Sequence, residues 1–377
     1  MTEIYVIRHV QAEGNLFRMM QGHWDGNVTE LGCRQRDALA LRFRDINIDA
    51  LYSSDLSRAV FTASAITQYH DIEMQIDRRL REINTGSWEG VPFSNLEWNY
   101  PKQYYNFMNR AEDFSFEGAE TFRQVQDRMM EALRDIAEAN DGKTVAVTSH
   151  GVSIRCLVCA LLGISLNDTK NAPVFVNTGV ARILYDKGKF TVDYINDSSH
   201  LGDLPRTHAT ISVMFRDEAI DPREHRDFYC SCYADAWKSA HGSLKGFNPE
   251  PYYLSAVEHY LYDPKSVFMI YHGDKPVGLL DLDSAKGAHA KYGWVSLLYL
   301  SEEYRHQNYG VQVIGRAIVK YSLAGMTSLR LLVSEDNKDA LAFYRKWGFR
   351  ELSSQTGANS RLLLLERDLR GNCNGHV

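Results

Sequence analysis

The first half of this chain alternates short apolar runs, each followed by polar side chains, with segments of helical spacing. The strand candidates are residues 4–7, 50–53 and 145–149. Between them, apolar residues recur every three or four positions from Ala59 to Ile66 and from Phe122 to Ile136, which predicts helices. This alternation predicts an α/β domain with a mostly parallel sheet and helices on both faces. Ligands of such sheets bind beyond the carboxyl ends of the strands.

The pattern changes after residues 196–205, a polar and turn-rich segment that is the best linker candidate. Apolar runs at 267–271 and 277–282 flank a turn and predict a hairpin. The remaining expected elements are a strand at 293–300, a helix carrying Val311, Ile314, Ile318 and Tyr321, a strand at 330–333, a helix at 340–347 ended by Gly348, and a strand at 361–366. Hairpins first and helices later predict an α+β domain. Because 377 residues are many for one core, we expect two domains, at 1–200 and 206–370.

The composition is that of an ordinary soluble protein, with 44% hydrophobic and 24% charged residues. A net charge of −6 argues against a nucleic-acid surface, which needs a basic face. The longest apolar run, 156–164, is too short to span a membrane, and the first residues lack the pattern of a secretory signal. Cys156 and Cys159 form a CxxC pair, but they lie within an apolar helix, where buried thiols are common. Cys230 and Cys232 lack a second ligand pair for zinc, and we expect all six cysteines to be reduced. We therefore expect a cytoplasmic protein with no metal, membrane or nucleic-acid partner.

Several of the polar side chains that follow the strands suit a phosphate ester. Arginine matches phosphate oxygens best, which points to Arg8 and Arg58. His9, next to Arg8, is a candidate nucleophile, because a neutral imidazole can attack phosphorus directly. His150, after the third strand, could hold the equatorial oxygens of the transferring group. Glu82 is the best-placed carboxylic acid to protonate the leaving alcohol.

These residues resemble the histidine phosphatase superfamily, the phosphoglycerate-mutase-like enzymes, over about residues 1–194. The resemblance rests on four ordered blocks, which are Arg8-His9, residues 52–59 with Arg58, residues 80–90 with Glu82, and Ser149-His150-Gly151. It implies a phosphorylated His9, Glu82 as acid and then base, and phosphate contacts from Arg8, Asn15, Arg58 and His150. No metal would be required, because the arginines supply the positive charge. Without this resemblance, the two histidines could be polar strand ends and the arginines could form surface ion pairs.

Two features leave the first substrate open. Val10 stands where the family usually has a glycine after the catalytic histidine, so the loop or the pocket could differ there. Residues 92–116 are rich in aromatic side chains, namely Trp98, Tyr100, Tyr104, Tyr105, Phe107 and Phe114. Packing of a cap over the sheet accounts for most of them. One or two could instead face the pocket and select the organic leaving group.

A second site is predicted at a loop between a strand and a helix. The pyrophosphate of an acyl-coenzyme A can be held by successive backbone N–H groups that open a helix. The loop consists of Arg305, His306, Gln307, Asn308, Tyr309 and Gly310. It resembles the cofactor loop of the GNAT N-acetyltransferase superfamily, and the resemblance spans about residues 208–369. Asn308 replaces the first glycine of the family pattern, and asparagine tolerates left-handed backbone better than most residues.

The same resemblance implies roles for two residues of the following helix. Tyr344 would protonate the departing thiolate, and Asn337 would bind near the acetyl-coenzyme A. Tyr344 could instead be a core aromatic on the periodic face of that helix. Glu302 and Glu303 lie near the end of the central strand, but each could be a surface charge, so the general base stays open.

We therefore expect a bifunctional enzyme. Its first domain would hydrolyse a small phosphoester, and its second would transfer an acetyl group from acetyl-coenzyme A to a small amine. Two alternatives stay open, a phosphoglycerate-type mutase for the first domain and an acetyl-coenzyme A sensor for the second. Neither the phosphoester nor the amine can be identified from the sequence.

Overall fold

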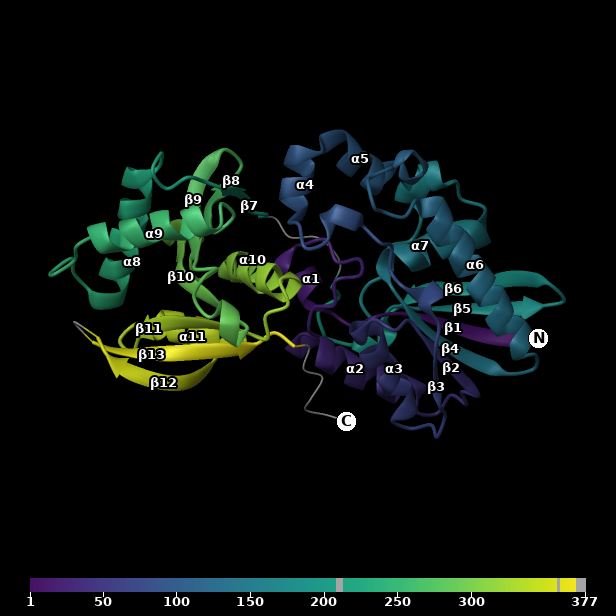
Figure 1. The fold of residues 1–377 in the computed structure, drawn as a ribbon. Coiled ribbons are helices and arrows are strands. Elements are labelled where there is room, and N and C mark those ends of the chain that lie inside the picture. The colour runs from purple at the N-terminus through teal and green to yellow at the C-terminus, as the bar shows by residue number, and fades with distance from the viewer. Residues whose placement is uncertain (208–212, 358–359, 371–377) are drawn as a thin grey trace. The chain divides into compact units, whose positions relative to one another are not determined.

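The structure is a computed structural model, and it describes residues 1–207, 213–357 and 360–370 (Figure 1). These residues form two compact units. The first contains residues 1–91 and 96–207, and the second contains residues 92–95 and 213–370. His208, where the second resemblance begins, lies outside the described residues. No helix among the described residues is long and apolar enough to cross a membrane.

The first unit is built on a sheet of six strands in the order β3-β2-β4-β1-β5-β6. Its strands are β1 (Thr2–Arg8), β2 (Ala50–Ser53), β3 (Met74–Ile76), β4 (Thr144–Ser149), β5 (Val180–Asp186) and β6 (Lys189–Asp197). The strands β1 to β4 pair in parallel, whereas β5 and β6 add an antiparallel hairpin at one edge. The mostly parallel α/β sheet is therefore confirmed.

The helices of this half cover both faces of the sheet (Figure 1). They are α1 (Glu13–Phe17), α2 (Glu30–Phe43), α3 (Ser57–Thr67), α4 (Phe93–Asn99), α5 (Pro101–Asn109), α6 (Phe122–Ala139) and α7 (Gly151–Leu162). Alternate residues of β1 face opposite sides, because side chains of a strand alternate. Tyr5 and Ile7 pack against Leu39 and Phe43 of α2, in a core that also contains Ile66 of α3.

The parallel strands of the first unit end in register, and this register positions the first site. Arg8 of β1 lies opposite Ser149 of β4, and Ser53 of β2 lies opposite Thr148 of β4. The segments that follow these strands therefore leave the sheet at the same edge. This is the edge at which an open α/β sheet binds its ligands.

The second unit contains a sheet of seven strands in the order β12-β13-β11-β10-β9-β8-β7. Its strands are β7 (Arg216–Ala219), β8 (Val267–His272), β9 (Lys275–Leu282), β10 (Tyr292–Leu300), β11 (Ser328–Ser334), β12 (Arg350–Thr356) and β13 (Arg361–Asp368). Its helices are α8 (Arg226–His241), α9 (Glu250–Tyr262), α10 (Gly310–Leu323) and α11 (Lys338–Lys346). Within the described residues β10 and β11 are the parallel pair, and the other neighbours are antiparallel. This α+β arrangement confirms the expected fold class.

The linker prediction was wrong in its position. Asn196 and Asp197 lie in β6, and Leu201 is 2% exposed, so this segment is part of the first unit. A polar composition concealed it, because edge strands carry polar residues on their solvent side. The sequence analysis also did not anticipate α8 and α9. Their apolar faces are largely aromatic and pack on β8 to β10 around Tyr229 and Ala256.

Candidate active sites

The edge of the first sheet brings two histidines from separate strands together. The imidazole rings of His9 and His150 lie 5.1 Å apart between their centroids. His9 is 3% exposed, and His150 has no exposed surface. Burial lowers the pKa of both rings well below 6.5, and the nearby Arg58 lowers them further. Both imidazoles are therefore neutral at physiological pH, as a nucleophile on phosphorus requires.

The hydrogen bond of His9 selects its tautomer. Its Nδ1 lies 2.6 Å from the carbonyl oxygen of Val10. A carbonyl oxygen only accepts, so Nδ1 carries the proton and Nε2 keeps the lone pair. The main chain around His9 is held as well, because its carbonyl oxygen accepts a hydrogen bond of 2.9 Å from Asn177 Nδ2. His9 is thus fixed in the form in which Nε2 can act as a nucleophile.

Two arginines give this cluster its positive charge. Arg58, in the first turn of α3, has no exposed surface, donates to the carbonyl oxygen of Gly22 at 2.7 Å and lies 3.5 Å from the carboxylate of Asp25. Arg8 donates from Nη1 to the carbonyl oxygen of Phe175. Burial lowers the pKa of Arg8 to about 10, so it remains cationic at neutral pH. The Nε atoms of both arginines are buried without a partner among the described residues. These unused donors suit an oxyanion.

His150 presents a further unused atom. Its Nε2 lies 2.9 Å from the hydroxyl oxygen of Ser54, and its Nδ1 is buried with no partner among the described residues. When Ser54 donates to Nε2, the ring proton is on Nδ1 and can be donated to a bound oxygen. The sequence analysis did not assign Ser54, although it lies in the polar string that follows β2.

Glu82 is held at the amino terminus of α7. Its Oε1 accepts hydrogen bonds from the N–H and hydroxyl groups of Ser153 at 3.0 and 3.2 Å, and its Oε2 accepts from the N–H of Val152 at 3.1 Å. The glutamate is 7% exposed. Oε2 accepts fewer bonds than Oε1, and its remaining lone pair is free for a proton. The carboxyl group of Glu82 is therefore held at the first turn of α7, which begins directly after His150.

Asn15 and Asn177 connect α1 to the nucleophile. Asn15 Oδ1 accepts a hydrogen bond of 3.1 Å from the N–H of Ala12 and lies 3.5 Å from Asn177 Nδ2, which also bonds His9. This orientation leaves Asn15 Nδ2 without a partner among the described residues, as a phosphate contact needs. Asn177 is 1% exposed and was missed in the sequence analysis, since no local pattern distinguishes an isolated asparagine in a loop.

In the second unit, a cavity of about 550 Å³ opens where the two parallel strands separate. β10 and β11 pair only from Tyr292 opposite Ser328 to Val295 opposite Leu331. β10 continues to Leu300, and its register against β9 shifts between Val295 and Leu297. Residues 298–300 line the cavity on one side and α11 lines it on the other. Backbone groups on the unpaired part of β10 are therefore available to a ligand lying between the strands.

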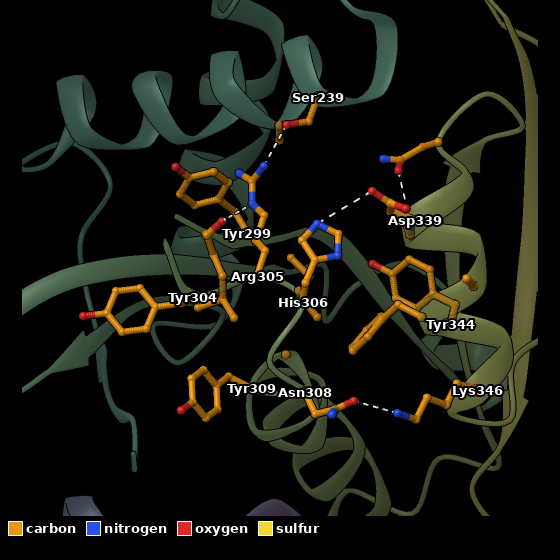
Figure 2. Close-up of a pocket in the computed structure, with 18 residues that line it drawn as sticks. Ser239, Tyr299, Tyr304, Arg305, His306, Asn308, Tyr309, Asp339, Tyr344 and Lys346 are labelled. Atoms are coloured by element: carbon orange, nitrogen blue, oxygen red, sulfur yellow. Dashed lines mark hydrogen bonds and ion pairs between the residues drawn. The ribbon is translucent and has the colours of Figure 1, made fainter. Parts of the chain in front are cut away.

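The predicted cofactor loop lies at this cavity (Figure 2). His306 and Asn308 have positive φ angles of 57° and 61°. Alternation of left-handed and right-handed residues turns successive N–H groups toward one side, which makes a concave anion site. Among the described residues, the N–H groups of residues 306–309 have no acceptor. The loop leads into α10, whose first N–H groups are also free at a helix start. This fits the pyrophosphate of an acyl-coenzyme A.

The side chains of the loop, in contrast, are mostly engaged elsewhere. Arg305 donates to the carbonyl oxygen of Leu300 at 2.6 Å, to Ser239 at 2.8 Å and to Asp235 at 2.7 Å. Gln307 turns its amide to a carbonyl oxygen of the preceding turn and is absent from the cavity lining. Figure 2 shows the ring of His306 between Arg305 and the phenol of Tyr344. The side chains thus shape the loop, and its N–H groups are left for a ligand.

Tyr344 and Asn337 both line the cavity. Tyr344 is 8% exposed, and burial raises the pKa of its phenol, which keeps the proton on the oxygen at neutral pH. Asn337 caps α11 by accepting a hydrogen bond of 3.1 Å from the N–H of Ala340. Its Nδ2 has no partner among the described residues. Glu302 and Glu303 do not line the cavity, and Glu303 pairs with a lysine.

Comparison with known proteins identifies both halves. Residues 4–198 match the histidine phosphatase superfamily (branch 1), a stretch longer than half of the chain. The chain belongs to the histidine phosphatase superfamily. Residues 226–349 match the acetyltransferase (GNAT) family, which follows in the predicted order. The first unit is hereafter the histidine phosphatase domain, and the second is the GNAT domain.

The relatives of the histidine phosphatase domain include proteins named as phosphatases and proteins named as mutases. Phosphoserine phosphatase 1 of Hydrogenobacter thermophilus is 30% identical over 167 residues, which are 44% of this chain and 79% of that protein. A probable phosphoglycerate mutase (GpmB) of Yersinia pestis is 30% identical over 210 residues, 54% of this chain and 97% of that protein. The solved structure of YhfR from Bacillus stearothermophilus is 31% identical and has a TM-score of 0.52. The match covers 53% of this chain and the whole of that chain.

The two departures from the family patterns have simple structural settings. The side chain of Val10 is fully buried. Its main chain makes two hydrogen bonds: the N–H donates to Thr62 at 2.9 Å, and the carbonyl oxygen accepts from His9 Nδ1 at 2.6 Å. Asn308 adopts the left-handed conformation at the position of the missing glycine, and its Oδ1 accepts a hydrogen bond of 2.6 Å from Lys346. Asn308 thus adopts a conformation that glycine favours, whereas Val10 does not have a positive φ.

Packing of a cap does not account for most of the aromatic residues of segment 92–116, because Trp98, Tyr100 and Tyr105 are exposed. Phe107 and Phe114 are buried around Trp88, whereas Trp98 and Tyr105 are both 57% exposed. Tyr104 is partly buried.

Proposed function

We propose that the chain is a bifunctional enzyme. Its histidine phosphatase domain hydrolyses a phosphomonoester through a phosphohistidine on His9. Its GNAT domain transfers an acetyl group from acetyl-coenzyme A to a small amine. The observation that carries the first part is the buried set of unused atoms, Arg8 Nε, Arg58 Nε and His150 Nδ1, gathered around a neutral His9. We also propose that the domains extend over residues 1–200 and 206–370.

In the first step, His9 Nε2 attacks phosphorus and the bond to the leaving alkoxide breaks. Arg8, Arg58 and Asn15 bind the phosphoryl oxygens, and His150 donates from Nδ1 as charge develops on them. Glu82 gives its proton to the leaving oxygen. The arginines supply positive charge that is already in place before the reaction.

In the second step, Glu82 acts as the base. It removes a proton from a water molecule, whose oxygen attacks the phosphorus of phosphohistidine. The P–N bond breaks, its electron pair returns to Nε2, and inorganic phosphate leaves. Glu82 is then protonated again, as it was at the start. The hydrogen bonds to Ser153 and Val152 keep the carboxyl group in one place during both steps.

In the GNAT domain, the residues at the cavity fit acetyl-coenzyme A, because free loop N–H groups and a gap between two strands are both present. Bound acetyl-coenzyme A supplies the acetyl group. The N–H groups of residues 306–309 would hold the pyrophosphate. Asn337 would donate a hydrogen bond from Nδ2 to another part of the bound cofactor. Tyr344, protonated and facing the cavity, would give a proton to the departing sulfur.

Phosphate release from a panel of metabolite phosphoesters tests the first half of the proposal, with His9→Ala as the control. We expect turnover of at least one ester that disappears in the variant. Acetylation of a panel of amines, with Tyr344→Phe as the control, tests the second half. A folded protein that is silent in the first panel and merely binds acetyl-coenzyme A in the second would contradict the proposal.

A mutase is the second candidate, because one relative is named a probable phosphoglycerate mutase. It would use the same His9 and return the phosphoryl group to a second oxygen of the substrate. Formation of a phosphorylated isomer without net phosphate release, detected by phosphorus NMR, would favour it over hydrolysis.

A further inference from the structure

Glu82 lies in an irregular segment of the histidine phosphatase domain. After the single helical turn Arg78–Leu80, the chain forms no helix or strand before residue 86. Within the described residues, the carbonyl oxygens of Arg79, Arg81 and Glu82 accept no hydrogen bond from the backbone. A carbonyl group that lacks a backbone partner needs a side chain or water instead. The position of Glu82 therefore depends on the side chains that surround this segment.

One arginine of α6 supplies partners to all three carbonyl groups. Arg128 donates from Nη1 to the carbonyl oxygens of Arg79 and Arg81 at 2.6 and 2.8 Å. From Nη2 it donates to the carbonyl oxygen of Glu82 at 3.1 Å. Its Nε and Nη2 also donate to the two carboxylate oxygens of Glu120, at 2.8 and 3.1 Å. Because a guanidinium has five N–H groups, these bonds use every donor, and none is left for a phosphate.

The carboxylate of Glu120 extends this arrangement to the other side of Glu82. Its Oε2 also accepts a hydrogen bond of 2.8 Å from the N–H of Asn84, whose carbonyl oxygen accepts from the N–H of Glu120 at 2.9 Å. Burial disfavours the charged form of Glu120, but the bonds from Arg128 and Asn84 outweigh it and lower its pKa. The side chains of Arg128 and Glu120 are 17% and 25% exposed, so water and salt screen this pair less than a surface pair. Together they anchor the main chain before and after Glu82.

Other side chains support the same segment at single positions. Ser153 donates to the carbonyl oxygen of Arg81 at 2.7 Å, and His23 Nε2 lies 3.0 Å from the carbonyl oxygen of Glu82. Arg128 is the partner that all three carbonyl groups share. Glu82 is thus held from two directions, by the first turn of α7 at its carboxyl group and chiefly by Arg128 at its main chain.

We propose that Arg128, paired with Glu120, is the positioning residue of the acid and base Glu82. It keeps the main chain of Glu82 where the carboxyl group can give a proton to the leaving oxygen and later take one from water. A misplacement of about 1 Å can lower a rate by about 100-fold. An irregular segment has few backbone bonds of its own to resist such a shift. This inference rests on the proposed phosphatase function.

Arg128→Lys tests the geometry while it keeps the charge. The single nitrogen of a lysine carries three N–H groups and cannot span three carbonyl groups and a carboxylate. The charge should be kept because the pKa of His150, which burial lowers most, is also lowered by Arg128.

The expected loss is in turnover and not in binding. For the alkyl phosphoester that the wild type hydrolyses fastest in the panel above, kcat should fall by about 10- to 100-fold. KM should change by less than about threefold, since Arg128 has no donor free for the substrate. The first turnover of p-nitrophenyl phosphate, measured by stopped flow, should keep its rate, because p-nitrophenolate leaves without a proton.

A double-mutant cycle separates positioning from folding. In a Glu82→Gln background no carboxyl group remains to be placed, so Arg128→Lys should lower kcat by less than about twofold further. A residue that merely stabilises the fold would lower kcat by the same factor in both backgrounds, and that result would overturn the proposal. Arg182→Lys is the matched control, because Arg182 of β5 also forms ion pairs of 2.8 Å with two carboxylates, those of Glu3 and Asp193. It should keep the wild-type kcat.

A second variant keeps the test decisive if Arg128→Lys does not fold. Glu120→Gln keeps the size of the side chain but replaces one of its acceptor oxygens by a donor. It should lower kcat for the alkyl ester by about 3- to 10-fold, with the first turnover of p-nitrophenyl phosphate again unchanged. Equal losses for the two esters in either variant would refute the role of Arg128.

Failure of this inference is distinguishable from failure of the proposed function. If no ester is hydrolysed with dependence on His9, the phosphatase proposal fails and the role of Arg128 fails with it. If the wild type is active and the folded Arg128 and Glu120 variants keep its kcat, the phosphatase proposal stands and the role of Arg128 is refuted.

Discussion

The two proposed sites use different parts of the polypeptide. In the histidine phosphatase domain, His9, Arg58, Glu82 and His150 are each 7% exposed or less, and their side chains carry the chemistry. In the GNAT domain, the N–H groups of residues 306–309 have no acceptor within the described part of the chain, while the side chain of Arg305 is bound to its neighbours. The first site is made of buried side chains, and the second is made largely of backbone. Substitutions should therefore act very differently in the two domains.

The physical reason lies in the charge that each site must hold. A transferring phosphoryl group develops charge on several oxygens at once, and fixed arginines and imidazoles stabilise it best away from water. A pyrophosphate that is only bound, and does not react, can be held by N–H groups and a helix terminus. We therefore expect side-chain substitutions to reduce activity strongly in the first domain. In the second domain, we expect cofactor binding to be weakened mainly by substitutions that disturb the backbone.

The largest expected effect is that of His9→Ala. Removing the nucleophile should lower phosphate release by more than about 10⁴-fold, because the proposed covalent intermediate forms on His9. Binding of acetyl-coenzyme A, measured by calorimetry, should be unchanged. If a folded His9→Ala protein lost both activities, the description as two separate sites would be wrong.

Glu82→Gln should reduce turnover by about 10²- to 10⁴-fold, the usual contribution of a general acid or base. The loss in the first step should be smaller for p-nitrophenyl phosphate, whose leaving group needs no proton. Measuring the burst of p-nitrophenol separately from steady-state turnover distinguishes the two steps. Equal losses for good and poor leaving groups would argue against Glu82 as the acid.

Tyr344→Phe should lower acetyl transfer by about 10- to 10³-fold, because the departing sulfur loses its proton donor. The affinity for acetyl-coenzyme A should change little. The phenol contributes one hydroxyl group, and its ring packs against Phe349 in either case. An unchanged rate would mean that Tyr344 is a core aromatic and not an acid.

A matched pair in the cofactor loop tests whether its backbone matters more than its side chains. A Cβ on Gly310 would lie 2.9 Å from the ring of Phe343, so Gly310→Ala must shift the start of α10 or that ring. We expect an affinity loss for acetyl-coenzyme A of about tenfold, or roughly 1.4 kcal/mol. Gln307→Ala should change it by less than about twofold, since the amide points away from the cavity. The reverse order would show that side chains hold the cofactor.

The smallest expected effect is the pH dependence of stability. The contributions of His150 and His259 to it have opposite signs. The pKa of His150 is below its unfolded value, so the unfolded chain takes up the extra proton and the domain loses stability as pH falls below about 6.5. Burial disfavours the charged form of His259, but Asp281 and Asp283 outweigh it and raise its pKa. Its contribution is therefore present below about pH 6.5 and is lost as pH rises through the folded value.

Calorimetry of two variants checks these signs. His259→Gln should destabilise the GNAT domain more at pH 5.5 than at pH 8.5. His150→Gln should flatten the acid slope of the histidine phosphatase domain. Parallel shifts of both transitions in either variant would contradict the assignment of the two histidines to independent environments.

Much of both sites could be predicted from the sequence, because their residues follow strands. Arg8 is the last residue of β1, His9 and His150 each come directly after a strand, and parallel strands end at one edge. Glu82 comes after no predicted strand; it was predicted as the best-placed carboxylic acid, and its role as acid and then base was implied by the family resemblance. Asn177 and Ser54 were missed because their role comes from partners distant in the chain, which no local pattern contains.

Other features needed the three-dimensional arrangement. The amphipathic pattern of α8 and α9 is built from tyrosines such as Tyr229 and Tyr253, which are apolar on one side and polar at the tip, so helical spacing was not recognised. The strand β6 was concealed by polar edge residues.

The central claim is that His9 carries the phosphoryl group. Its most direct test is intact-protein and peptide mass spectrometry after rapid mixing with a hydrolysed phosphoester and an alkaline quench, which preserves phosphohistidine. We predict one phosphoryl group per chain on the peptide that contains His9, and none in His9→Ala. Turnover with no labelled His9, or with the label on another residue, would contradict the account.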